Sequence, residues 1–452
     1  MTTNKRHGFP VREFVSLPLA VAVYAFALHW VYKNIVTEPF AYLGYRYTSP
    51  PLEIVFLTWV LAALVAIALP RRIKRPSDLV IWVLFVVCMG PSILMSPYVG
   101  LLEGWRSLGL SAAIAVTYIA IALFLRRPAR SLPSRIAVSP TTFWLLLGGF
   151  SLVTYVLMAA TTGLSLRYIS LLEVYSVRDE YSAALGGGGV LGYLVSTQAN
   201  VINPVILARG IYSRRALPII LGIVGQLVLY SGTGFKTVLF SLPAILVVAL
   251  LFRKNLRPRA AVFVWGTVAL ITVSALADEL QGTNLWTSLF SRRFLFTPGL
   301  LSSAYVSFFS DNPQAHLGHS VLRQFVDYPY TLSPPRVIGE WLIGSADTAA
   351  NANVFADGFA NFGWAGLVGA GIVLAIYLRF LDRAAFGLPA AVAGLVVLMP
   401  TIALSNSAVL TAMLSHGLVV ALIVVAIAPR TGWGLRRKSR SNSPGALVGA
   451  SS

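Results

Sequence analysis

Two arginines in the first half of this 452-residue chain are spaced to bind an anion together. Arg167 and Arg178 are eleven residues apart in a segment that ends in four glycines. On one helix, eleven residues turn through about 1100° and rise about 16 Å, so the two side chains would share a face. Guanidinium groups fit phosphate oxygens. The spacing favours a phosphate site; the alternatives are an ion pair of Arg178 with Asp179 or Glu180, or extension to lipid headgroups.

A second basic pair, Arg292 and Arg293, lies in a strongly apolar segment. On a helical wheel both fall among Leu285, Leu289 and Phe296 instead of opposite them. A helix lying on a membrane surface would separate its charges from its apolar side chains. Arginines among apolar side chains need partners. If the segment is helical, the pattern predicts a bound anion or a structural ion pair.

Lys236 follows the sequence Ser-Gly-Thr-Gly-Phe at the start of an apolar run. Exposed amides at a glycine turn and a helix start can bind an oxyanion. The alternative is that the lysine extends toward the membrane surface. A nucleotide-binding GxxxxGK[ST] loop is not present, because Gly234 and Lys236 are not adjacent.

Residues that could move a proton lie further along the chain. His316 and His319 are three apart, and without a nearby third ligand they favour a general base or an ordinary loop histidine over a metal site. Asp357 lies at the start of an apolar run and needs a partner or a function; the alternative is an aromatic interfacial segment with a helix cap. Arg323 and Arg336 lie between these groups and are candidates for substrate binding.

The elements that position these residues are long apolar runs. The chain is 57% hydrophobic and 11% charged, with a mean hydropathy of +0.75, whereas soluble domains carry about 25% charged residues. A run of about 20 apolar residues spans a membrane as a helix, because its backbone can find no water there. The sequence therefore predicts an all-α polytopic membrane protein with twelve spans, at approximately 14–33, 53–70, 78–97, 107–125, 141–161, 189–208, 216–232, 236–252, 261–277, 359–378, 386–404 and 408–428.

Charge in the loops predicts the topology. Of the 35 basic residues, 25 fall at the termini and in every second loop, with only three acidic residues among them. Lys and Arg are enriched in cytoplasmic loops, so both termini are predicted to be cytoplasmic. The net charge of +19 then lies near anionic headgroups and does not indicate nucleic acid. Residues 1–430 would form a single transmembrane domain with one large outer loop at about 278–358, and residues 431–452 a disordered basic cytoplasmic tail.

Several functional classes are disfavoured by what the sequence lacks. The only cysteine is Cys88, which excludes an intramolecular disulfide and a cysteine-based metal site. No Asp-x-Asp pair occurs in an outer loop, which disfavours a metal-dependent sugar transferase. Carboxylates within the predicted spans are almost absent, which disfavours an ion-coupled transporter.

This arrangement resembles the O-antigen polymerases, the oligosaccharide repeat-unit polymerases of bacterial surface polysaccharide synthesis. The resemblance covers the topology and residues 160–370. Within residues 231–236, the family often has arginine at the position of Lys236. Four motifs carry the resemblance: residues 177–181 (Val-Arg-Asp-Glu-Tyr) running into glycines, 231–236 (Ser-Gly-Thr-Gly-Phe-Lys), Arg292-Arg293, and 353–363 (Asn-Val-Phe-Ala-Asp-Gly-Phe-Ala-Asn-Phe-Gly).

The resemblance implies an enzyme that joins oligosaccharide units carried on polyprenyl diphosphate, at the outer face of the bacterial cytoplasmic (inner) membrane. The growing chain leaves its polyprenyl diphosphate when a sugar hydroxyl of the next unit attacks. No metal or nucleotide cofactor is required. A flippase and a chain-length regulator are candidate partners, besides membrane lipids.

Site roles follow from this reaction, because preorganised cations stabilise a leaving group that gains negative charge. Arg178 and Arg292 are expected to hold the leaving diphosphate. A base could be His319, His316 or Asp357, and the sequence leaves this open. The remaining candidates, expected to bind the diphosphate or the glycan, are Arg167, Lys236, Arg293, His316, Arg323 and Arg336.

Two other readings stay open at this point. A polysaccharide ligase, or a transferase that uses a polyprenyl-phosphate sugar, would keep the same arginine chemistry and differ in its acceptor or donor. A transporter or flippase for a lipid-linked anion would bind the same charge without making a glycosidic bond. The long outer loop and the lack of an internal repeat disfavour the transporter.

Overall fold

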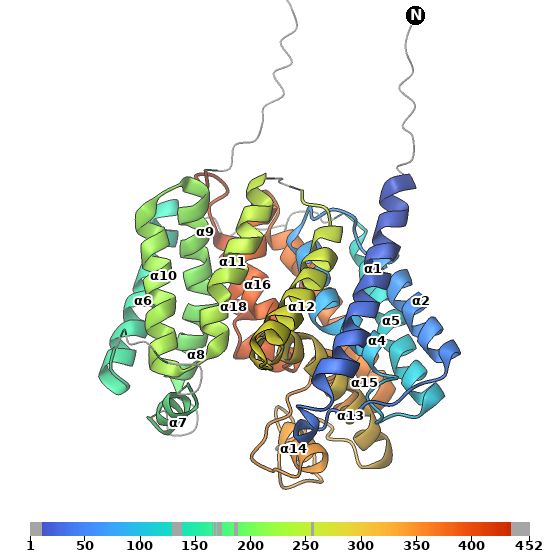
Figure 1. Cartoon of the computed structure of the whole chain (residues 1–452). Helices are drawn as coiled ribbons and strands as arrows, with labels where there is room; N and C mark the ends of the chain where they lie inside the picture. Colours follow the sequence, from blue (N-terminus) through green and yellow to red (C-terminus); the bar gives the residue numbers. More distant parts are fainter. Residues whose placement is uncertain are drawn as a thin grey trace, which may run out of the picture.

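A computed structural model describes residues 11–128, 138–164, 166, 169, 174–184, 189–254 and 257–434. Within these ranges the chain forms helices and no strands, with one isolated backbone bridge between Arg72 and Arg259 (Figure 1). The fold class predicted from the apolar runs is therefore confirmed as an all-helical bundle with helices suited to a membrane.

The helices of the first half are α1 (Val11–Val31), η1 (Tyr32–Val36), η2 (Ala41–Leu43), α2 (Leu52–Ala68), α3 (Pro76–Leu84), η3 (Phe85–Met89), α4 (Gly90–Met95), α5 (Gly104–Leu125), α6 (Pro140–Thr161), α7 (Val174–Ala184), α8 (Val190–Thr197), η4 (Gln198–Ile202), α9 (Asn203–Ser213) and α10 (Ala216–Thr233). Those of the second half are α11 (Lys236–Lys254), α12 (Ala261–Gln281), η5 (Thr287–Phe296), α13 (Thr297–Asp311), α14 (Pro334–Ile343), α15 (Val354–Ala384), α16 (Ala390–Ala403), α17 (Val409–Leu414) and α18 (Leu418–Ile427).

Eight helical segments of the described chain are long and apolar enough to cross a membrane. Four shorter apolar helices, α2, α11, α16 and α18, overlap the remaining predicted spans. The eight segments are 16–36, 76–95, 104–125, 140–161, 190–213, 216–233, 261–281 and 354–384.

The arginine-rich loops lie together at one end of the bundle, which we call the arginine-rich end. Ile73 donates a backbone hydrogen bond to Pro258 (3.0 Å), so residues 70–75 contact residues 257–260. Arg379 donates to the carbonyl of Pro128 (2.9 Å), and Arg430 to that of Ala384 (2.7 Å). The start of α1 and the end of α18 also lie at this end (Figure 1). Loops that the charge pattern assigned to one side thus share one end.

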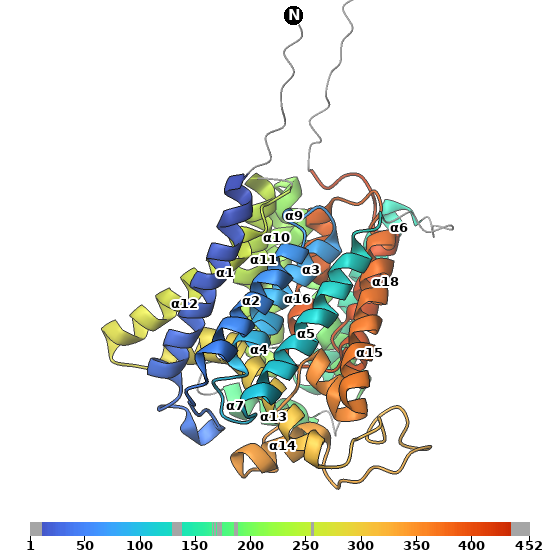
Figure 2. The ribbon, with the colours of Figure 1, turned by 90° about the vertical axis from the view of Figure 1, so that its right-hand side faces the viewer.

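The other loops meet at the opposite end, here the loop-rich end. The Thr48 amide donates to the Tyr98 carbonyl (2.9 Å), and the Ala315 amide to the Ala360 carbonyl (2.9 Å). Figure 2 shows α14 and the loop before it at this end, below α13.

Within the predicted outer loop, residues 297–311 form a helix that is buried in the bundle. Most of α13 is inaccessible to solvent, including Ser302 and Ser303. Ser302 shares a hydrogen bond with Ser92 of α4 (2.9 Å) and accepts another from Asn353 (2.7 Å). The helix has 15 residues, too few to be recognised as a membrane span, and its serines lower its hydropathy. Its burial was therefore not predicted.

The tenth predicted span also differs from the structure. The helix begins at Val354, five residues before the predicted start, and is kinked at Phe362 and Gly363. Gly363 has φ 58°, a conformation that glycine adopts without steric cost. The kink separates a short segment that carries Asp357 from the long remainder of α15.

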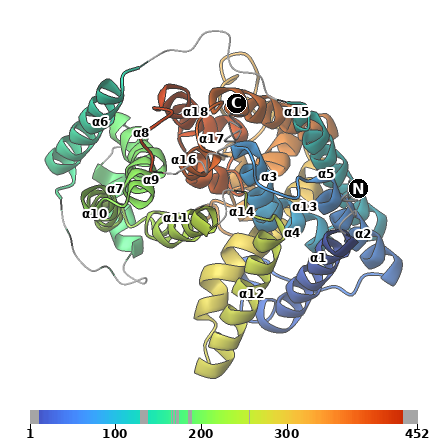
Figure 3. The same ribbon diagram turned by 90° about the horizontal axis from the view of Figure 1, so that it is seen from above.

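The bundle contains two packing groups. A small group from α6 to α11 buries Met158, Val177, Leu191 and Tyr230, and a larger core joins most of the remaining helices. Seen from above, α6 to α10 lie to one side of the bundle, next to α11 and α16 (Figure 3). Arg178 lies on α7, which contributes side chains to the smaller group. Arg292 and Asp357 lie on η5 and α15, which contribute to the larger core.

Candidate functional site

Arg178 lies at the loop-rich end on α7, next to the turn between α10 and α11. Gly234 in that turn has φ 65°, and a Cβ placed on it would lie 2.5 Å from the carbonyl oxygen of Val174 and 3.2 Å from the Arg178 amide nitrogen. A glycine is therefore needed where α7 approaches the turn. The Arg178 guanidinium lies over the ring of Phe235, 5.4 Å from its centroid. The motif that carries Arg178 and the motif that ends in Lys236 are thus in direct contact.

The predicted pairing of Arg178 with Arg167 on one helix is wrong. α7 begins at Val174, and Ile169 before it is not helical, so no continuous helix joins the two positions. Arg167 itself lies outside the described residues. Of that pair, the structure describes Arg178 alone.

Lys236 begins α11, whose second turn packs against the segment that carries the second basic pair. Phe240 is one turn further along α11, on the same face as Lys236. Its ring packs against Phe290 (5.5 Å between centroids) and Phe294 (6.5 Å) of η5. Phe294 is adjacent to Arg293 in the chain. The aromatic contact therefore brings the start of α11 beside the segment that carries the two arginines.

The segment with Arg292 and Arg293 is the π-helix η5, and a buried carboxylate fixes its start. Asp278 accepts hydrogen bonds from the amides of Trp286 (2.9 Å) and Thr287 (2.6 Å). The i→i+5 pattern of a π-helix changes which side chains share a face. Arg292 is half-buried and Arg293 is exposed, so the predicted burial of both among apolar side chains holds only for Arg292.

Arg292 is held by neutral groups. Its guanidinium donates to Ser288 (2.9 Å) and lies 4.6 Å from the centroid of the Phe40 ring. The Thr297 hydroxyl donates its only proton to the Arg292 carbonyl (2.9 Å). In the hydrogen bond between Thr297 and the buried Tyr45 hydroxyl (2.8 Å), the donor is therefore Tyr45. Burial raises the pKa of Tyr45, against the opposing effects of the Thr297 hydrogen bond and of the charges of both arginines. The phenol therefore stays neutral beside these cations.

We call Arg178, Lys236, Arg292 and Arg293 the basic row. Its members come from α7, α11 and η5. Phe235 contacts Arg178, and Phe240 packs against Phe290 and Phe294 of η5, whereas Arg292 contacts Phe40. In the part of the chain that the structure describes, neither Arg178 nor Arg292 forms an ion pair. The pairing of Arg178 with Asp179 or Glu180, open from the sequence, does not form.

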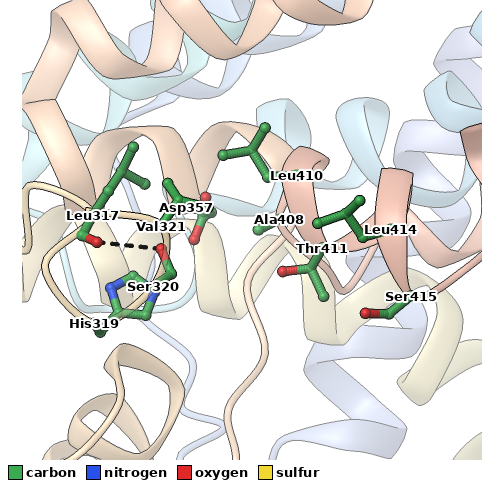
Figure 4. Close-up of a pocket in the computed structure, with 10 residues that line it drawn as sticks. All are labelled: Leu317, His319, Ser320, Val321, Asp357, Ala408, Leu410, Thr411, Leu414 and Ser415. Atoms are coloured by element: carbon green, nitrogen blue, oxygen red, sulfur yellow. Dashed lines mark hydrogen bonds between the residues drawn. The ribbon is translucent and has the colours of Figure 1, made fainter. Parts of the chain in front are cut away.

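His319 and Asp357 line one cavity of about 210 Å³ at the loop-rich end (Figure 4). The remaining walls come from residues 317–321 and from the segment 408–415 around α17. No hydrogen bond or ion pair to the Asp357 carboxylate forms among the residues described. The helix cap expected in this segment is Asn353, whose side chain accepts from the amides of Phe355 and Ala356.

The His319 ring is half-buried and lies 5.5 Å from the Tyr328 ring. Its Nδ1 is buried, and within the described chain it has no hydrogen-bond partner. Burial lowers the pKa of His319. The imidazole is therefore neutral at neutral pH and able to accept a proton.

Three other predicted residues lie apart from this cavity. His316 is exposed, its ring 5.5 Å from that of Phe362. Arg323 is exposed in the loop after the histidines, and Arg336 is exposed on α14. The structure joins none of the three to the basic row by a contact among the described residues.

Thr411 and Ser415 line the same cavity and were not predicted as site residues. The Ser415 carbonyl accepts a hydrogen bond from Ser196 of α8 (2.6 Å), so the cavity borders the smaller packing group that carries Arg178. Hydroxyl groups in an apolar run are too common to mark a site.

No family model, curated protein or solved structure matches this chain.

Proposed function

We propose that this chain is a metal-independent glycosyltransferase that polymerises oligosaccharide units carried on a polyprenyl diphosphate. The basic row would hold the departing diphosphate, with Arg178 and Arg292 as its main members. The single observation that carries the proposal is that Arg178 and Arg292 contact aromatic rings and have no carboxylate partner among the described residues.

The contacts of the two arginines support this role. An arginine with a carboxylate partner is already neutralised, whereas Arg178 and Arg292 contact aromatic rings and a hydroxyl group. Guanidinium groups donate paired hydrogen bonds to phosphate oxygens. When the glycosidic carbon separates from the diphosphate oxygen, the electron pair leaves with the phosphate, and nearby fixed cations stabilise that charge.

A membrane setting is part of the proposal. All twelve apolar helices would cross the bacterial cytoplasmic membrane, with the arginine-rich end inside and the basic row at the outer surface. The polyprenyl tail would then lie among the lipid-facing helices, and the diphosphate at the level of the headgroups. The concentration of arginine at one end of the bundle supports this orientation.

Arg178→Ala and Arg292→Ala test the proposal. Each variant is expressed in source cells without the native copy, and surface polysaccharide is separated by length. We expect each change to lower polymerisation by about 10²–10³-fold, the effect typical of losing one stabilising donor. Long chains should disappear while the protein remains in the membrane.

Arg106→Ala is the matched control. Arg106 forms an exposed pair with Asp311 (3.5 Å) and belongs to the same end of the bundle. Its loss should leave the chain-length ladder unchanged. Normal ladders from both Arg178→Ala and Arg292→Ala would refute the diphosphate role. A single addition by the wild-type protein, in place of a ladder, would indicate a ligase or another single-transfer enzyme.

A further inference from the structure

The cavity at His319 and Asp357 is separate from the basic row and has the groups that a sugar hydroxyl needs. Its walls offer an imidazole, a carboxylate and the hydroxyls of Ser320, Thr411 and Ser415, with leucine and valine side chains between them (Figure 4). Sugars present hydroxyl groups and apolar ring faces, and such mixed walls bind both.

The backbone around His319 is built to aim this side chain. His316 and Leu317 both have positive φ, 46° and 60°, which is costly for residues other than glycine. The Leu317 amide donates to the Asn361 side chain (2.8 Å) and the His316 amide to the Asn361 carbonyl (3.2 Å). The short first segment of α15 thus fixes the strained turn. Strain of this kind persists where the surroundings impose it, often at functional sites.

The two histidines differ in what they can do. His316 is exposed against Phe362 and does not line the cavity. His319 lines it, with a buried Nδ1 that lacks a partner within the described chain. A base must reach the proton that it accepts, and of the two histidines His319 is the one beside a space large enough for a sugar hydroxyl group.

The cavity also lies where a second substrate could meet the first. The hydrogen bond from Ser196 to the Ser415 carbonyl joins its wall to α8, which packs in the same group as α7. The other wall belongs to α15 of the larger core. The cavity thus lies between α8 and the start of α15.

We propose that this cavity receives the acceptor sugar and that His319 takes the proton of the attacking hydroxyl. The inference rests on the proposed function and adds the acceptor site to it. The hydroxyl oxygen forms the new bond to the anomeric carbon, and the bond from that carbon to the diphosphate oxygen breaks. The electron pair leaves with the diphosphate, and the proton passes to the imidazole. The Asp357 carboxyl group lines the same cavity and can accept a hydrogen bond from a sugar hydroxyl group.

His319→Gln tests the base, with purified protein and lipid-linked glycan extracted from source cells that lack this gene. We expect kcat to fall about 10²–10⁴-fold, the usual contribution of a general base. The KM for the lipid-linked donor and the Kd for undecaprenyl diphosphate should stay within about twofold, since the basic row is intact. Asp357→Asn should lower kcat by roughly tenfold.

Two further variants make the test decisive. Gln324→Ala, at an exposed position of the same loop, is the control and should retain wild-type kinetics. Thr411→Phe narrows the cavity without replacing His319 and should raise the KM for the acceptor. Added imidazole should restore part of the activity of His319→Ala, which a structural role would not allow.

The outcomes separate the two proposals. Wild-type kcat in His319→Gln, or unchanged acceptor KM in Thr411→Phe, would overturn the acceptor site and leave the diphosphate role intact. Absence of any glycosidic bond formation by the wild-type protein would instead overturn the proposed function itself.

Discussion

Arginines at the two ends of this bundle have different surroundings. At the arginine-rich end, Arg75 contacts the carboxylates of Asp78 (3.3 Å) and Asp382 (3.2 Å), and Ser77 donates to Asp382 through both its amide and its hydroxyl. At the loop-rich end, Arg178 and Arg292 contact aromatic rings and a serine hydroxyl. The first arrangement satisfies its charges internally, whereas Arg178 and Arg292 have no carboxylate partner among the described residues.

The difference separates two reasons for placing arginine in a membrane protein. Asp382 joins the end of α15 to the start of α3, so its arginine partner contributes to packing. Neither Arg178 nor Arg292 joins two helices through an ion pair with a carboxylate of the described residues. The charge pattern assigns both sets to loops, and only the partners distinguish a structural arginine from a binding one.

The largest expected effect is on stability and concerns the arginine-rich end. Asp382→Ala removes the buried partner of Arg75 and of Ser77. Breaking a buried pair from one side costs about 3–5 kcal/mol. We expect a clear loss of thermal stability in detergent and less protein in the membrane. Arg178→Ala should show neither change.

Asp311→Ala is the matched control, since its pair with Arg106 is exposed. Exposed pairs contribute at most about 1 kcal/mol. If Asp382→Ala were no less stable than Asp311→Ala, the ion pair of Arg75 with Asp382 would not be the structural contact that we infer.

A smaller effect should follow from moving α7 away from the basic row. Gly234→Ala places a methyl group 2.5 Å from the Val174 carbonyl oxygen. The left-handed conformation alone costs about 1–2 kcal/mol for a residue with a Cβ, and relief of the contact should shift α7 and Arg178. We expect reduced polymer length, measured on surface polysaccharide.

Gly282→Ala separates the two causes, because Gly282 has a similar φ of 61° and nothing within 4 Å of its Cβ position. It should lose stability only, with the ladder preserved. Equal ladders from Gly234→Ala and Gly282→Ala would show that the position of α7 does not matter for the reaction.

Much of the architecture could be predicted from the sequence. The apolar runs coincide with eight helices long enough to cross a membrane and with four shorter apolar helices, because burial in lipid requires continuous hydrophobicity and leaves a strong signal. The alternation of charged loops predicted which loops share an end. The buried helix α13 was missed, since its serines are satisfied by Ser92 and Asn353, which are distant in sequence.

The site was predicted less completely. Arg178, Lys236 and Arg292 were singled out by their local sequence, and the structure packs the elements that carry them through rings that the sequence did not identify, above all Phe235 and Phe240. The choice between His316 and His319 depends on which ring faces a cavity built from α15 and α17. Packing between segments that are distant in sequence cannot be predicted from the local spacing of residues.

The central claim is that the basic row binds diphosphate, and direct binding tests it best. Undecaprenyl diphosphate is titrated into purified wild-type protein, Arg178→Ala and Arg292→Ala in one detergent, with Arg106→Ala as control. We predict Kd values at least about tenfold higher for the first two variants, equivalent to 1.4 kcal/mol each, and no change for the control. Equal affinity in all four proteins would contradict the claim.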